Sequence, residues 1–408
     1  MMFHKTNEVK VLRDPIHGYI HVEYQVIWDV INNRWFQRLR RIRQLGGASV
    51  VYHTAEHTRF SHSLGVYELV RRMVTEIPDL DQSLNQREKM IAMLAGLLHD
   101  IGHGPYSHAL EAITNENHEL FTCRIIEEET EITEILNHAS KGLAKEVADV
   151  IRHKSQNPLL SQLISSQLDA DRMDYLLRDA YFTGTKYGEF DLERILRVIR
   201  VHDDRQLVIK ESGVYAVENY IMARYHMYWQ VYYHPVARSF ESILHSLFRR
   251  LKDIPIQGEK VEVMKPILQG RRLALEEYFR LDEYAFSYAF GQWVDHPDPI
   301  VADLCRRLRD RDLFDYVDYS GVQQEMIVKV LKEKGFDKKY YLTKDLVNQK
   351  PYQPYTKNEQ GAIWVRLKSG DTKELESASV IVDGLTHGKD NNDNKIFFPK
   401  EVRFESKD

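Results

Sequence analysis

Residues 94–108 read LAGLLHDIGHGPYSH, and the rest of the chain can be interpreted outward from this stretch. The apolar run that enters it has the length and residue types of a buried helix, and the Gly-x-Gly-Pro after it is a strong helix stop. His99 and Asp100 therefore stand side by side at the C-terminal end of a buried helix. Because both groups are costly to bury alone and both bind divalent cations, the pair predicts half of a metal site.

Two further segments are candidates for the remaining ligands. Residues 59–66 (RFSHSLGV) place His62 at the beginning of an amphipathic stretch, and residues 169–179 (DADRMDYLLRD) carry several carboxylates. A single buried histidine is more often a satisfied core residue than a ligand, so no residue identifies the site alone. The order His, His-Asp, Asp on three helices would supply two nitrogen and two oxygen donors and leave positions open for water and substrate.

These three segments, in this order, resemble the deoxynucleoside triphosphate triphosphohydrolases (dNTPases) of the HD-domain family, the branch that includes the vertebrate SAM-and-HD-domain enzymes. The resemblance covers most of residues 9–320 and is dense only around the motifs. It implies a divalent cation bound by His62, His99, Asp100 and Asp171. The donor types leave Mg²⁺, Mn²⁺, Fe²⁺, Ni²⁺ and Zn²⁺ all open.

Acid–base groups follow the metal motif. His108 and Glu111 are three residues apart and would share one helical face, where the carboxylate would raise the basicity of the imidazole. The resemblance implies that His108, Glu111 and His118 are catalytic and that His103 lies beside the substrate phosphates. Such groups can activate water or protonate a leaving group. The alternative for His118 is a helix cap or a surface residue.

The resemblance also implies a deoxynucleotide pocket. Tyr175 and Asp179 would contact the deoxyribose, and Arg172 would meet the charge of the triphosphate. Tyr232 would pack on the sugar and exclude a 2′-hydroxyl, although aromatic runs of this kind more often form cores or interfaces. Other positions that match the family beside phosphate and sugar are Gln44, Leu45 and Arg59. The implied reaction is hydrolysis of a dNTP to deoxynucleoside and inorganic triphosphate.

Regulation follows from the same resemblance. The family is commonly homotetrameric, with a dNTP or GTP bound at subunit interfaces as activator. Positions that would line one such site are Lys10, Val11, Asn32, Gln37 and Arg40. At Asn32 the chain departs from a guanine-reading relative, which carries aspartate. The alternative is that these positions are ordinary surface residues.

Composition narrows the class of protein. The 408 residues are 43% hydrophobic and 29% charged, as in ordinary globular proteins, and the net charge of −5 does not mark a polyanion binder. Nucleic-acid binding is therefore possible but not favoured. Cys123 and Cys305 lie far apart, which excludes a disulfide scaffold. With no apolar run near membrane-spanning length and no signal-like N-terminus, we expect a cytoplasmic protein without membrane contact.

The predicted fold is mainly α: an HD-domain helical core with a short N-terminal β-hairpin, a small inserted strand pair and a small α+β C-terminal unit. We expect the inserted strands within residues 201–217 and a continuous aromatic helix over 219–248. Beyond 336, three segments look like strands (340–342, 362–367 and 380–382), and 388–394 looks like a loop. The expected divisions are 1–50 (hairpin and helix with the regulatory positions), 51–250 (HD core), 251–335 (accessory helices) and 336–408 (C-terminal unit).

Two other functions stay open from the sequence. Another HD phosphohydrolase, acting on a phosphodiester or a guanosine polyphosphate, would use the same metal ligands. It would give no reason for Tyr175, Asp179 and Tyr232 to line a deoxyribose pocket. A non-catalytic sensor of nucleotides or nucleic acid would have no need of four ligands together with His108 and His118.

Overall fold

The structure is a computed structural model, and it describes residues 3–128, 130–202, 205–256, 261–345, 362–387 and 393–402. The backbone of His108 is described, whereas its side chain is not. The chain is mainly helical, as predicted, and its few strands form small sheets. Among the described residues, no helix combines the length and the apolar character needed to cross a membrane.

The predicted N-terminal hairpin is present. Strands β1 (Lys5–Asp14) and β2 (Gly18–Tyr24) pair antiparallel, with Asp14 opposite Gly18. The carboxylate of Asp14 accepts the backbone N–H groups of Ile16 and His17, so it closes the turn between the strands. Helices α1 (Gln25–Asn32) and α2 (Arg34–Arg38) follow and bury their apolar faces against the core.

Three helices at the centre of the molecule carry the metal motifs: α3 (Arg59–Glu76), α5 (Gln86–Leu98) and α11 (Ala170–Thr183). A capping box between Asn85 and Glu88 begins α5, and residues 89–98 of that helix are all buried. Asp169 caps α11, and Gly184 ends it in the left-handed conformation. Helix α3 packs against both α5 and α11, so all three motifs meet on one side of α3.

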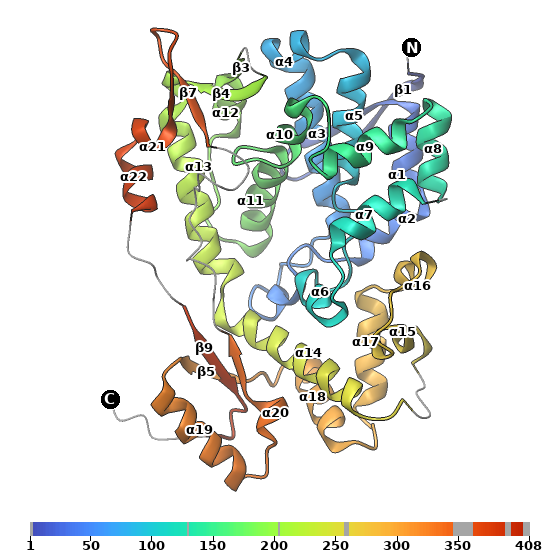
Figure 1. The fold of residues 1–408 in the computed structure, drawn as a ribbon, viewed down its shortest axis with the longest axis vertical. Coiled ribbons are helices and arrows are strands. Elements are labelled where there is room, and N and C mark those ends of the chain that lie inside the picture. Colours follow the sequence, from blue (N-terminus) through green and yellow to red (C-terminus); the bar gives the residue numbers. More distant parts are fainter. Residues whose placement is uncertain are drawn as a thin grey trace.

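Further helices lie in two regions of the molecule. In the upper part of Figure 1 they are α4 (Pro78–Ser83), α7 (His118–Glu127), α8 (Glu131–Ala139), α9 (Leu143–Ile151), α10 (Pro158–Ile164) and α12 (Leu192–Val198). The others are α6 (His108–Thr114), α15 (Lys265–Leu268), α16 (Leu275–Phe279), α17 (Glu283–Trp293), α18 (Pro299–Asp310) and α19 (Gly321–Glu333).

The predicted continuous helix over 219–248 is wrong. Helix α13 (Val214–Met227) passes into a π-helical turn, η4 (Tyr228–Tyr232), and a new helix, α14 (Pro235–Asp253), begins after it. Pro235 is the first residue of α14, a position that proline favours, and its missing N–H and fixed ring prevent it from continuing the earlier helix. Aromatic periodicity across the break concealed it.

The inserted strand pair is β3 (Ile199–His202) and β4 (Gln206–Lys210), and it is part of a larger sheet. That sheet has the order β3-β4-β7-β8 with β7 (Trp364–Arg366) parallel to β4 and β8 (Thr372–Glu374) antiparallel to β7. A second sheet has the order β5-β9-β6, from β5 (Asp315–Asp318), β9 (Lys395–Phe398) and β6 (Thr343–Asp345). Residues after 336 are thus shared between two sheets that lie apart (Figure 1).

Two of the three C-terminal segments predicted as strands are helical. Most of 340–342 belongs to α20 (Lys338–Tyr341), and 380–382 begins α22 (Val380–Thr386), next to α21 (Leu375–Ala378). Asp337 and Ser379 cap the helices α20 and α22 with their side chains, a stronger local signal than the tyrosines of α20 and the β-branched residues of α22. The third segment contains β7, as predicted. Of the predicted loop, residues 388–392 lie outside the described part of the chain.

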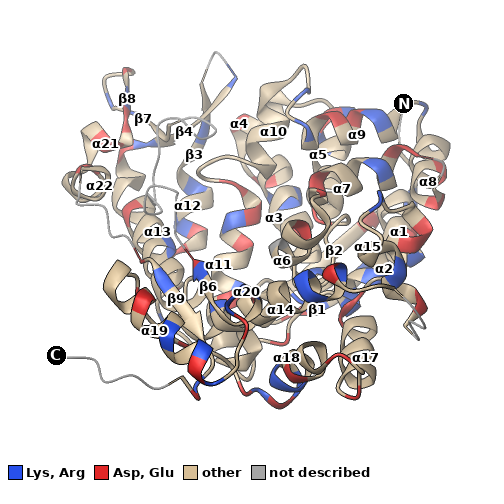
Figure 2. Cartoon of the chain, turned by 60° about the horizontal axis from the view of Figure 1, so that its bottom comes forward, with Lys and Arg blue, Asp and Glu red and all other residues tan. Residues whose placement is uncertain are grey.

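Buried apolar residues form two cores. The first joins the hairpin, α1–α5, α7–α13 and the β7 region, in the upper part of Figure 1. The second joins α6, α14, α17, α18 and β9 below it. The loop after α5 passes from the first core to the second, because Ile101 belongs to one and Tyr106 to the other. Acidic and basic residues are interspersed over the elements (Figure 2).

Candidate metal and active site

The four predicted metal ligands come together. His62 lies in the first turn of α3, His99 and Asp100 directly follow α5, and Asp171 is the second residue of α11. The Nε2 atom of His62 lies 3.0 Å from Oδ1 of Asp171 and 3.6 Å from Oδ2 of Asp100. The Nε2 atom of His99 lies 3.3 Å from Asp100 and 3.5 Å from Asp171. The ligand atoms of His62, His99 and Asp100 all lie within 4.8 Å of one another, and Asp171 lies against the two imidazoles.

This donor set fits a divalent cation. Neighbouring donors of an octahedral ion with bonds of about 2.1 Å lie about 3 Å apart, which is close to the separations in the cluster. The Nδ1 atom of His99 lies 2.9 Å from the carbonyl oxygen of Gly96, so a neutral ring that donates there turns the lone pair of Nε2 toward the cluster. That Nε2 is buried and makes no hydrogen bond within the described residues. A cation would satisfy it.

The charges of the cluster favour a positive group between the carboxylates. Burial disfavours a charge on His62, but its hydrogen bonds with Asp171 and Asp174 raise its pKa to about 10. Burial would also raise the pKa of Asp171, yet the hydrogen bond with His62 and the nearby imidazole of His99 hold that pKa well below its ordinary value. The pKa of Asp100 is also well below its ordinary value, because the positive charge of Arg59 and the neighbouring imidazoles together outweigh the effect of burial. A proton or a metal ion is therefore needed to neutralise the negative charges of Asp100 and Asp171.

A buried layer of side chains lies behind His62, and sequence reasoning missed it. The Nδ1 atom of His62 lies 2.8 Å from Oδ2 of Asp174, and Asp174 also contacts Arg178 and His17. Arg178 in turn contacts Asp14 in the hairpin turn. Two signals were present in the sequence: Asp174 and Arg178 lie in the same motif as Asp171, and an N-terminal hairpin, the element that carries His17, was predicted.

The predicted acid–base groups lie beside the four predicted metal ligands His62, His99, Asp100 and Asp171, which we call the metal cluster. His103 Nε2 is 3.3 Å from Oδ1 of Asp100, and the rings of His103 and His118 stack with centroids 3.7 Å apart. Glu111 contacts Nδ1 of His118. Burial and the neighbouring Arg59 lower the pKa of His103 well below its ordinary value, so this ring is neutral. His108, predicted as catalytic, begins α6, and its side chain lies outside the described part of the structure.

A cavity of about 310 Å³ opens next to the cluster, large enough for a small-molecule ligand. Asp179 lies at its wall, where it accepts a hydrogen bond of 2.7 Å from the hydroxyl of Tyr232 and lies 2.7 Å from Nε2 of His57. Sequence reasoning missed His57, which no local pattern singles out. Tyr175 meets Tyr232 edge to face. The predicted substrate residues that line the cavity are Gln44, Leu45, Arg59, Tyr175, Asp179 and Tyr232.

Two arginines predicted to bind phosphate differ in position. Arg59 lines the cavity, contacts Asp100 through Nη1 and donates from Nη2 to the hydroxyl of Ser107 at 2.8 Å. It therefore connects the cavity with the metal cluster. Arg172 contacts Asp169 at 2.8 Å and does not line this cavity as the described side chains define it. The structure thus brings six of the seven predicted substrate residues together and leaves Arg172 apart.

The loop between α5 and α6 has an unusual backbone. Tyr106 and Ser107 adopt φ angles of +57° and +50°, a region that side chains other than glycine seldom occupy. Both residues line the cavity. The Tyr106 backbone N–H donates to buried Glu283 at 3.2 Å, and the hydroxyl of Ser107 accepts from Arg59. Strained residues of this kind concentrate at functional sites, where the surrounding structure holds them in place.

The predicted regulatory residues lie on the N-terminal elements. Lys10 and Val11 lie on β1, Asn32 ends α1, Gln37 lies in α2 and Arg40 follows it. Val11 is about half exposed, and Arg40 donates from Nε to the side-chain oxygen of Gln37 at 2.8 Å. These contacts lie within one chain, so the regulatory role stays a prediction.

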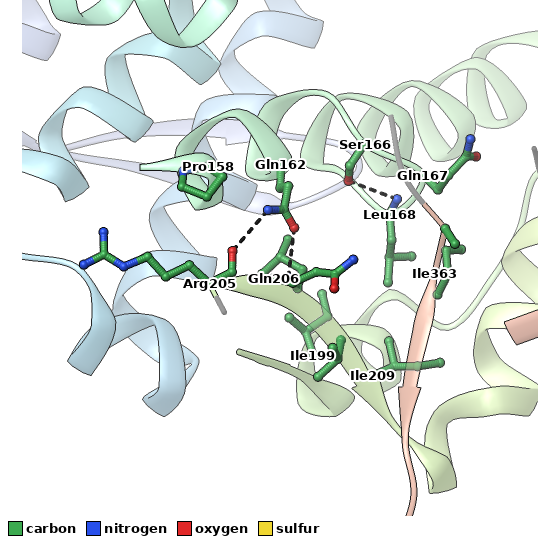
Figure 3. A pocket seen from close by; sticks show the side chains of 13 residues that line it. Pro158, Gln162, Ser166, Gln167, Leu168, Ile199, Arg205, Gln206, Ile209 and Ile363 are labelled. Atoms are coloured by element: carbon green, nitrogen blue, oxygen red, sulfur yellow. Dashed lines mark hydrogen bonds between the residues drawn. The ribbon is translucent and has the colours of Figure 1, made fainter. Parts of the chain in front are cut away.

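A second cavity of similar size, about 330 Å³, lies between α10, the β3–β4 hairpin and residues 362–363 (Figure 3). The side chain of Gln162 accepts from the backbone N–H of Leu207 and donates to the carbonyl of Arg205 at its edge. None of the described residues that line it was predicted as part of a site. The contact with the metal cluster, rather than volume, therefore singles out the first cavity.

Known proteins resemble this chain along most of its length. The family model of the HD domain matches residues 59–179, and that of the HD associated region matches 190–403. The uncharacterised protein YwfO of Bacillus subtilis is 46% identical over 98% of this chain and 94% of its own length. The deoxynucleoside triphosphate triphosphohydrolase SAMHD1 of Danio rerio is 26% identical over 85% of this chain and 60% of its own length. A crystallised phosphohydrolase of Bacteroides thetaiotaomicron superposes with a TM-score of 0.85, at 29% identity, over 96% of this chain and all of that one.

Proposed function

Because the chain belongs to the HD-domain family, we propose that it is a metal-dependent hydrolase that converts a dNTP to a deoxynucleoside and inorganic triphosphate. The likeness to a phosphohydrolase structure and to SAMHD1 supports a hydrolase. One observation supports the dNTP substrate most directly. The hydrogen-bonded pair of Asp179 and Tyr232 forms a wall of the cavity that Arg59 connects to the metal cluster.

The wall suits a deoxyribose. Asp179 uses one oxygen for Tyr232 and the other for His57, and a carboxylate has further lone pairs that can accept from a sugar hydroxyl. The ring of Tyr232 is held in place by this bond and by the edge of Tyr175. In our proposal, the ring occupies the space that a 2′-hydroxyl would need. Ribonucleotides would then be excluded by shape.

The proposed chemistry places water on the α-phosphorus and breaks its bond to the 5′-oxygen. When bound by His62, His99, Asp100 and Asp171, a divalent cation would supply an activated water and polarise an oxygen of the α-phosphoryl group. The guanidinium of Arg59 lies where it can donate to a phosphate oxygen.

The leaving 5′-oxygen needs a proton, and His118 is the described group best placed to supply it. Glu111 contacts Nδ1 of His118 and fixes the orientation of the ring, so that in our proposal Nε2 faces the leaving group and passes the proton to it. His108 is the other candidate for this role from the sequence, and Arg172 is the second candidate for the triphosphate.

We further propose a homotetramer that a dNTP or GTP activates at subunit interfaces, through the positions Lys10, Val11, Asn32, Gln37 and Arg40. The likeness to SAMHD1 and the exposure of β1 support this proposal. Cys123 and Cys305 are both buried and form no disulfide within the described residues, which agrees with the cytoplasmic location that we also propose.

A product assay tests the proposal. Purified protein is incubated with each dNTP, alone and in pairs, with Mg²⁺ or Mn²⁺, and products are separated by ion exchange. We expect deoxynucleoside and intact triphosphate, and no product from the matching ribonucleotides. Cleavage of one dNTP only when a second is present would support the activator site. Diphosphate or monophosphate products would contradict the reaction, and cleavage of phosphodiesters or guanosine polyphosphates instead would favour another HD phosphohydrolase.

A further inference from the structure

We infer that the turn of the N-terminal hairpin positions the metal ligand His62. The positioning residues are His17 and Asp14, which act through Asp174 and Arg178. These contacts connect the N-terminal hairpin with His62 in the first turn of α3. The contact between His17 and Asp174 joins residues 157 positions apart in the sequence. This inference rests on the proposed metal site and is independent of the proposed substrate.

Asp174 is held between two imidazoles. Its Oδ2 lies 2.8 Å from Nδ1 of His62, and its Oδ1 lies 2.6 Å from Nε2 of His17. The side chains of Asp174 and His62 are fully buried, and that of His17 is 1% exposed. Because an ionised carboxylate only accepts hydrogen bonds, both rings donate to it. Each oxygen of Asp174 therefore has its own imidazole partner.

Arg178 joins this carboxylate to the hairpin. Its guanidinium donates to Asp174 through Nε and Nη2, both at 2.9 Å, and to Asp14 through Nη1 at 2.8 Å. Asp14 also accepts the backbone N–H groups of Ile16 and His17. The same carboxylate thus anchors Arg178 and shapes the turn that carries His17. The result is a closed ring of buried hydrogen bonds between the hairpin and α11.

The ring of hydrogen bonds fixes how His62 faces the cluster. A carboxylate that accepts from one imidazole nitrogen sets the tautomer and the ring orientation, and it raises the basicity of the other nitrogen. In His62 that other nitrogen is Nε2, the atom that faces Asp100 and Asp171. If His17 is removed, Oδ1 of Asp174 loses one of its two hydrogen bonds and keeps only the one from Arg178, so the carboxylate is held less firmly. The orientation of His62 is then less well defined.

The space around Asp174 confirms how tightly this arrangement is packed. Gly65 lies on α3, three residues after His62, and a methyl group there would lie only 1.9 Å from Oδ1 of Asp174. It would also lie 2.4 Å from Nη2 of Arg178. Helix α3 can approach the carboxylate only because this position lacks a side chain. Asp174 has little room to change position while its partners stay in place.

The test is metal binding by the full chain, measured without substrate. Mn²⁺ affinity is obtained by competition with a chelator, and the visible spectrum of the Co²⁺ form reports the ligand field. We compare wild type with His17→Ala and His17→Gln. The matched control is His21→Ala, because His21 lies on the same hairpin but contacts Glu68 at 3.4 Å and not Asp174.

We expect His17→Ala to weaken Mn²⁺ binding by up to about 10-fold, the lower end of the cost of losing a group bonded directly to a ligand, because His17 acts through Asp174; the Co²⁺ spectrum should change as well. His17→Gln can still donate to Asp174 and should recover most of the affinity. His21→Ala should bind as wild type. Circular dichroism of the metal-free proteins shows whether each variant is folded. If His17→Ala does not fold, Asp14→Asn keeps an acceptor for the turn, removes the charge facing Arg178 and should weaken binding less.

Three results would overturn the inference. The first is a folded His17→Ala variant with wild-type affinity and spectrum. The second is an equal loss in His21→Ala, which would assign the effect to the hairpin as a whole. The third is a wild-type chain that binds neither ion, which would also remove the proposed metal site. Failure of the proposed substrate alone would show in the product assay and leave these titrations unchanged.

Discussion

The metal cluster and the cavity beside it are built in different ways. The cluster sits on three long helices of the first core, and a buried partner stands behind His62. The cavity is walled by a loop with strained backbone, by the π-helical turn η4 and by the start of α14. Arg59 contacts both. The predicted metal ligands are thus held by regular helices, whereas the cavity wall consists of a loop and of helix ends. The shape of the cavity can therefore change while the ligands keep their arrangement.

The largest expected effect comes from Asp171→Asn. The amide keeps the shape of the side chain but removes a negative donor from the cluster, so hydrolysis should fall on the order of 1,000-fold or more, as for other catalytic groups. Steady-state rates and Mn²⁺ titration measure this. The matched control is Asp169→Asn, two residues earlier, which contacts Arg172 and not the cluster. A fall below tenfold in the Asp171 variant would show that the cluster does not carry the activity.

Gly65→Ala tests how rigid the cluster is. The added methyl group would overlap Asp174, so we expect a loss of about 1–3 kcal/mol in the free energy of unfolding, together with weaker metal binding. Gly291 in α17 offers a matched control, because a methyl group there meets nothing within 4 Å. Gly291→Ala should raise stability by up to about 1 kcal/mol, since alanine favours helix. Thermal unfolding compares them, and equal stability of the two variants would contradict the close packing.

Glu283, behind the strained loop of the cavity, should make stability depend on pH. Burial raises its pKa from 4.5 to about 7, and its Oε1 accepts the backbone N–H groups of Arg43 and Tyr106. The folded state then binds a proton that the unfolded state releases, so this group loses stability as pH rises from about 4.5 to 7, by at most about 3 kcal/mol.

Glu283→Gln keeps the acceptor and removes the titration. Relative to wild type, the variant should gain stability between pH 5 and pH 8, as denaturant unfolding at several pH values would show. An unchanged difference between the two proteins across this range would mean that Glu283 stays ionised in the fold.

The smallest expected effect belongs to the cavity wall. Tyr232→Phe removes the hydrogen bond to Asp179 but keeps the ring, so kcat/KM for dNTPs should fall about tenfold, the value of roughly one hydrogen bond to a charged group. Mn²⁺ affinity should not change, and ribonucleotides should still be rejected. Tyr233→Phe is the control, because Tyr233 does not line the cavity. A loss of metal affinity in the Tyr232 variant would mean that cavity and cluster are not separable.

Local signals predicted much of this molecule. The apolar run and the glycines after it set the end of α5, and the resemblance selected His62 and Asp171, which the structure brings to His99 and Asp100. What they could not predict are contacts between distant segments. Nothing in the turn at His17 encodes a hydrogen bond to a helix 157 residues away, and nothing local pairs His57 with Asp179.

The secondary-structure errors have physical causes too. Pro235 was visible in the sequence, but the aromatic residues on both sides kept a helical period across it and hid the break. The short segments near 340 and 380 have β-branched or aromatic residues, which favour strands. Both are helical because the side chains of Asp337 and Ser379 accept backbone N–H groups of the first turn and stabilise the helix there. The parallel pairing of β7 with β4 joins segments far apart in the chain, which no short-range pattern can specify.

The most direct test of the proposed reaction is to hydrolyse a dNTP in water enriched in ¹⁸O and to analyse both products by mass spectrometry. Attack of water on the α-phosphorus with loss of the 5′-oxygen places the label in inorganic triphosphate and leaves the deoxynucleoside unlabelled. We expect this distribution, and no turnover by Asp171→Asn. Label in the deoxynucleoside, or products other than these two, would contradict the proposed function.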